Sequence, residues 1–91
     1  MNKTYEFLPN HLSQEDTDYY TSMNKGFTAT ADCLKVTYES GESETYVIFK
    51  GNWTPYGMVR DCGDHYIRAR YCGYERIDKD TLTVTEYVED K

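Results

Sequence analysis

The stretch CLKVTYESGESETYVIFK, residues 33–50, decides the fold of this chain. Leu34, Val36 and Tyr38 alternate with polar residues, which is the period-two pattern of a half-buried strand. Ser40 and Gly41 supply a tight turn, and residues 45–49 are apolar on both faces, as in a central strand covered on each side. The stretch therefore predicts a β-hairpin within an antiparallel sheet.

Further strands are expected on the C-terminal side of this hairpin. A short strand begins at residues 58–60, and residues 65–77 form a longer one in which Gly73 marks a bulge or bend. Leu82, Val84 and Val88 alternate with threonines, so residues 81–88 are expected to pair with 65–77 in a second hairpin.

The N-terminal part predicts a single short helix. Residues 1–12 read as irregular, and Ser13 followed by Asp16 resembles a capping box that starts a helix over 14–24. Tyr19 and Met23 form a narrow apolar stripe at i and i+4, which is expected to dock on the sheet.

Together these elements predict one domain over residues 1–91. The expected class is α+β, with an antiparallel sheet of four or five strands and one short N-terminal helix; the alternative is a small all-β barrel.

The composition favours a binding protein. Tyrosine accounts for 10 of the 91 residues, more than so small a core needs, and exposed tyrosine is typical of binding faces. The net charge of −6 argues against direct contact with nucleic acid or an anionic membrane, and it fits a partner with a basic surface. An odd count of 3 cysteines and the lack of a signal or membrane-spanning segment predict a cytoplasmic protein with free thiols.

No recognisable catalytic or phosphate-binding motif is present, so no enzymatic activity and no cofactor are expected. Cys62, His65 and Cys72 could converge on a metal with a fourth ligand from Asp61, Asp64, His11 or Cys33, which makes a small metal-binding protein one alternative. The competing interpretation of these three residues is buried thiols and a surface histidine.

Two sets of residues are the candidate binding surfaces. The first is acidic, with Tyr19 beside it, and it could join the predicted helix to the turn of the first hairpin: Glu15, Asp16, Asp18, Glu39, Glu42 and Glu44. Rows of carboxylates can imitate nucleic-acid phosphates and occupy a basic groove. The second set combines tyrosine, tryptophan and arginine, the residue types of interface hot spots: Trp53, Tyr56, Tyr66, Arg68 and Arg70.

Alternatives remain for the second set. Trp53 could instead fill the core from its loop, and the arginines could pair with Glu75 or Glu86 on a solvated face. Tyr66, Arg68 and Arg70 fall on one face of the predicted strand, and they would also suit a sheet that binds single-stranded RNA.

The sequence therefore predicts a small acidic inhibitor of a nucleic-acid-binding host enzyme. In composition it is similar to the anti-CRISPR and anti-restriction proteins of phages and mobile elements. A homodimer is a further option, since an exposed edge strand and a tyrosine-rich face both favour self-association.

Overall fold

The computed structural model describes residues 3–51, 58–70 and 73–80, apart from the side chain of Arg70. This part of the chain holds one helix and six strands. The helix is α1 (Gln14–Met23), and the strands are β1 (Lys3–Leu8), β2 (Thr28–Tyr38), β3 (Ser43–Lys50), β4 (Val59–Asp61), β5 (His65–Arg70) and β6 (Gly73–Asp78).

The six strands form one sheet whose order follows the sequence, from β1 at one edge to β6 at the other. Neighbouring strands are antiparallel, except that β3 and β4 run parallel and pair Ile48 with Val59. The hairpin predicted over 33–50 is confirmed as β2 and β3. Its turn is closed by the Tyr38 amide donating to the Glu42 carbonyl, and Gly41 adopts a φ of 98° that favours glycine.

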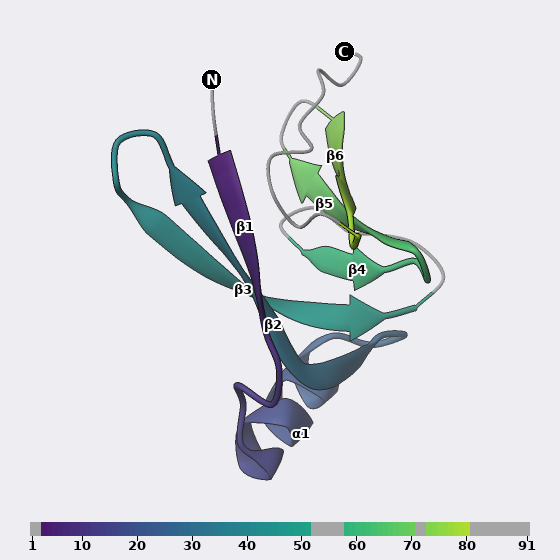
Figure 1. Cartoon of the computed structure of the whole chain (residues 1–91). Helices are drawn as coiled ribbons and strands as arrows, with labels where there is room; N and C mark the ends of the chain where they lie inside the picture. Colours follow the sequence, from purple (N-terminus) through teal and green to yellow (C-terminus); the bar gives the residue numbers. More distant parts are fainter. Residues whose placement is uncertain (1–2, 52–57, 71–72, 81–91) are drawn as a thin grey trace.

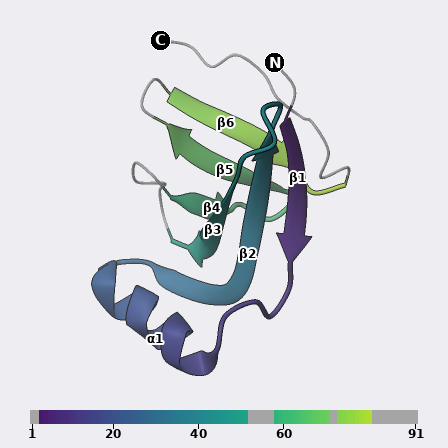
Figure 2. The same ribbon diagram turned by 90° about the vertical axis from the view of Figure 1, so that its left-hand side faces the viewer.

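The sheet curls into a half-barrel (Figure 1), with α1 beside the end at which β2 begins. Figure 2 shows that β2 bends strongly, and its pairing with β3 shifts register between Ala29 and Cys33. Bulges of this kind bend a strand and help a sheet to curve. The protein is thus mostly sheet and lies nearer to the small-barrel alternative, and the expected count of four or five strands is too low.

Every strand contributes a side chain to the main core inside the curl. The buried members of this core are Tyr5, Leu34, Val36, Ile48, Val59, Tyr66 and Ile77. Full burial of one such aliphatic side chain is worth about 1.5–3 kcal/mol. The interior of the half-barrel is therefore the main source of stability.

A smaller cluster lies apart from the main core, where Phe27, Ala29 and Phe49 are buried and Val47 and Met58 pack against them. Gly51 is required beside it, because a Cβ at this position would collide with the Phe27 ring.

The helix begins as predicted, but it does not dock as predicted. The Ser13 hydroxyl accepts from the Asp16 amide at 3.1 Å, and Thr21 Oγ1 accepts from the Ala29 amide at 2.9 Å, which ties the helix to β2. At 100° per residue, Tyr19 and Met23 lie roughly opposite Thr21, so both are exposed. The expectation that they form the docking stripe is wrong.

Two other expectations about the strands are also wrong. Residues 3–8, expected to be irregular, form β1, in which Lys3, Tyr5 and Phe7 face the interior and alternate with outward-facing residues. Residues 65–77 are not one strand, because the chain reverses between Arg70 and Gly73 and β5 pairs with β6. The predicted strand over 81–88 lies outside the described residues.

Candidate functional site

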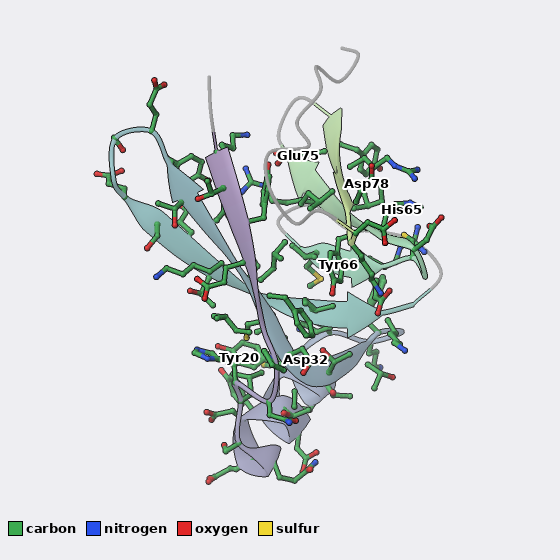
Figure 3. The ribbon with its side chains drawn as sticks, in the orientation of Figure 1. Tyr20, Asp32, His65, Tyr66, Glu75 and Asp78 are labelled. Atoms are coloured by element: carbon green, nitrogen blue, oxygen red, sulfur yellow. The ribbon has the colours of Figure 1, made fainter. Side chains whose placement is uncertain are left out.

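Among the described residues, three charged side chains are buried inside the half-barrel: Lys3 of β1, Arg68 of β5 and Glu75 of β6. Lys3 Nζ lies 3.2 Å from Glu75 Oε2, and Arg68 Nε lies 3.1 Å from Glu75 Oε1. Arg68 and Glu75 are direct cross-strand partners, whereas Lys3 reaches Glu75 from the opposite edge of the sheet. In Figure 3, Glu75 lies on the side of β6 that is turned toward β1.

Two tyrosines and a second carboxylate extend this cluster toward solvent. Arg68 Nη1 donates to the Tyr38 and Tyr46 hydroxyls at 3.1 and 3.4 Å, and its Cζ lies 5.1 Å from the Tyr46 ring centroid. Both hydroxyls donate to Glu44 Oε1. These hydrogen bonds, first from Tyr46 and then from Tyr38, lower the pKa of Glu44. Desolvation, followed by the bond to Glu44, raises the pKa of Tyr46.

We call this set the interior network: Lys3, Tyr38, Glu44, Tyr46, Arg68 and Glu75. Its two buried cations both contact the buried carboxylate of Glu75, and the exposed carboxylate of Glu44 is joined to Arg68 through the two tyrosine hydroxyls. Buried charges of this kind require partners, and these partners fix the curl of the sheet.

The expected arginine face on β5 is not an outer surface. Tyr66 and Arg68 do share a face as predicted, but that face points into the half-barrel, where Tyr66 is only 4% exposed. The pairing of Arg68 with Glu75 exists, although it is buried rather than solvated. Because Tyr66 and Arg68 are buried, these two side chains do not support the alternative of an RNA-binding sheet. The side chain of Arg70 lies outside the described part.

The proposed metal ligands are placed only in part. Cys62 and His65 flank the β4–β5 turn, where the Cys62 amide donates to the His65 carbonyl at 2.9 Å. His65 Nδ1 lies 2.6 Å from Asp64 Oδ1, and this hydrogen bond lowers the pKa of Asp64. Cys72 is outside the described residues, and among those that are described no three potential ligands gather in one place.

The outer side of α1 is the most exposed apolar feature of the described chain. Tyr19 and Met23 are 56% and 63% exposed, and Tyr20 is exposed as well. The Tyr19 and Tyr20 rings meet edge to face with centroids 5.4 Å apart. We call this surface the helix surface: Glu15, Asp16, Asp18, Tyr19, Tyr20 and Met23, all of which are exposed.

Sequence reasoning placed Tyr19 and the three acids of this surface correctly on one helix, but it missed Tyr20 and assigned Met23, with Tyr19, to a docking stripe. No specific sequence signal pointed to Tyr20, because neighbouring helix positions are about 100° apart and do not face each other.

The acidic turn of the first hairpin does not join the helix surface. Glu42 and Glu44 lie at the far end of β2 and β3, whereas α1 lies where β2 begins (Figure 1). Glu44 pairs with Val36 of β2, whereas the helix is tied to β2 at Ala29, and these two positions are separated by roughly 20 Å of strand at about 3.3 Å per residue. A single continuous acidic surface is therefore wrong. Trp53 and Tyr56 lie outside the described residues.

A groove of about 260 Å³ lies between α1 and β3. Its wall at the helix includes Tyr20 and the C-cap residue Asn24, and the remainder includes Thr45, Tyr46, Val47, Phe49 and Met58. The buried ring of Phe49 and the half-buried Val47 and Met58 belong to the smaller apolar cluster, so the groove is lined mostly by apolar side chains.

No protein-family model, curated protein or solved structure matches this chain. Across residues 3–51, 58–70 and 73–80, no helix has the length and apolar character needed to cross a membrane.

Proposed function

We propose that the protein is a non-enzymatic binding module that docks on a basic surface of another protein through the helix surface. One observation supports this proposal above the others. Within Gln14–Met23 no residue is buried, yet the helix carries two tyrosines and a methionine. Large apolar side chains that a fold leaves in solvent are typical of interaction sites, and tyrosine is frequent among hot spots.

Charge supports a basic partner. Glu15, Asp16 and Asp18 lie on α1, which contains no lysine or arginine. Carboxylates gathered beside an aromatic pair would steer the molecule toward a positive surface and raise the association rate. The chain's net charge of −6 acts in the same direction.

The target class that fits best is a nucleic-acid-binding enzyme of a host, blocked in its basic groove in the manner of anti-CRISPR and anti-restriction inhibitors. The acidic, tyrosine-rich composition supports this class. The free thiols of Cys33 and Cys62 fit action in the cytoplasm.

A quantitative pull-down tests the proposal. The tagged protein is incubated with nuclease-treated host lysate, and captured proteins are measured by mass spectrometry for the wild type and a Tyr19→Ser/Met23→Ser variant. We expect one dominant protein that survives nuclease and is lost with the double variant. Since both side chains are exposed, the variant should keep its stability within about 0.5 kcal/mol.

The matched control is Tyr74→Ser on β6, an exposed tyrosine remote from α1. It should capture the same protein as the wild type. Capture that is equal for all three proteins, or lost on nuclease treatment, would contradict the proposal, and recovery of the chain itself would point to a homodimer.

A further inference from the structure

We propose that the groove between α1 and β3 receives one large apolar side chain from a basic segment of the partner. This inference rests on the proposed function and assigns a specific contact within it. The occupant is a segment of polypeptide in which lysines or arginines accompany an aliphatic or aromatic anchor.

The size of the groove favours a side chain over a small-molecule ligand. Sites for cofactors and drug-sized ligands usually occupy about 300–1,000 Å³. The groove has about 260 Å³, and its base is built from the apolar side chains of Val47, Phe49 and Met58. A pocket of this kind suits the anchor residue of a protein interface.

The groove is continuous with the helix surface. Successive residues of α1 are rotated by about 100°, so the helix circumference leads from Tyr20, which lines the groove, to Met23 and then Tyr19. A segment anchored in the groove would therefore also cover the exposed aromatic pair, which is fixed by its own edge-to-face contact.

The charged residues at the two ends of the groove indicate which kind of segment would bind and in which direction it would lie. Asp16 lies one turn from Tyr20 on the same side of the helix, toward the helix N-terminus, and Glu15 lies next to it. At the other end, Lys25 and Lys50 directly follow the lining residues Asn24 and Phe49. A bound segment would place its basic residues at the Asp16 end and its apolar anchor over Phe49.

The inference is tested with a random-peptide library displayed on phage and selected on the wild-type protein. Enriched peptides are then titrated by fluorescence anisotropy against Thr45→Lys, which places a cation on the exposed rim of the groove. The matched control is Thr4→Lys, the same substitution at an exposed site on β1 that does not line the groove. Thermal unfolding verifies that both variants fold.

We expect enriched peptides to combine basic residues with an apolar anchor. Their affinity should fall by about tenfold with Thr45→Lys and stay within about twofold with Thr4→Lys. Peptides that lose affinity for Tyr19→Ser/Met23→Ser but not for Thr45→Lys would overturn the groove assignment and leave the proposed function standing. Acidic peptides, or no enrichment, would overturn both.

Discussion

At the scale of single residues, Glu75 has the largest expected effect on stability, because its carboxylate lies against two buried cations, Lys3 and Arg68. Replacing Glu75 with Gln removes the charge and keeps the volume, which leaves both cations without that carboxylate in the interior. Breaking a buried ion pair in this way costs about 3–5 kcal/mol. Urea unfolding should show that loss in the free energy of unfolding.

The control for this experiment is Glu6→Gln, the same change at an exposed position of β1. It should alter the free energy of unfolding by less than about 0.5 kcal/mol. Equal losses in the free energy of unfolding at the two positions would mean that the interior network does not stabilise the sheet.

The lowered pKa of Glu44 predicts that the stability of the protein depends on pH. Its folded pKa lies below the ordinary value of 4.5, because the Tyr46 and Tyr38 hydroxyls donate to its ionised form. A carboxyl group whose pKa is lower in the folded protein than in the unfolded chain stabilises the fold at pH values above its unfolded pKa. This stabilisation is lost as the pH falls through the folded pKa. Glu44→Gln should therefore lower the unfolding temperature at pH 7 and have a smaller effect well below pH 4.5.

Glu42→Gln is the matched variant in the same hairpin, because the Glu42 carboxyl is exposed. It should leave the difference in unfolding temperature between neutral and acid pH close to that of the wild type. A Glu44→Gln protein with the full wild-type difference would contradict the assigned hydrogen bonds.

The sequence separated the two faces of β5 correctly, but it did not reveal which face is inside. Arginine is rarely buried unless it is paired, so Arg68 favoured an outer surface. Its partners Glu75 and Tyr38 come from other strands, and one of them lies 30 residues away. The pairing of β5 with β6 brings Glu75 to Arg68, and the curl of the sheet brings Tyr38 to it.

At the scale of elements, the N-cap of α1 is a local feature with a measurable contribution. The Ser13 hydroxyl satisfies the Asp16 amide, so Ser13→Ala should reduce the free energy of unfolding by about 1 kcal/mol. Ser22→Ala, within the same helix, should be close to neutral, because the Ser22 hydroxyl bonds only to the Tyr19 carbonyl and alanine favours helix. Urea unfolding of the two variants compares them directly, and equal losses would show that the cap adds nothing.

Elements with local signals were predictable, and elements defined by distant contacts were less so. The β2–β3 hairpin has alternation, a glycine turn and adjacent partners, and α1 has its cap. β1 offers only three alternating inward residues, and its partner β2 begins 20 residues after β1 ends. The β5–β6 reversal between Arg70 and Gly73 was read as a bulge, because a lone glycine in a strand pattern also fits a bulge.

At the scale of the whole molecule, the curl divides the charged residues into two groups with different roles. Lys3, Arg68 and Glu75 are turned inward and join β1 to β5 and β6, whereas the acids of α1 remain in solvent. The count of strands and the curl could not be predicted, because the parallel pairing of β3 with β4 leaves no periodic signal in the sequence.

The central claim is that α1 and the groove beside it form the binding surface. Hydrogen–deuterium exchange of the protein, alone and bound to the partner recovered by pull-down, tests this claim most directly. Slower exchange on binding is expected for the amides of Gln14–Met23 and Ser43–Lys50, with no change in Gly73–Asp78. Protection confined to Gly73–Asp78 or to the β4–β5 turn, with α1 unchanged, would contradict the account.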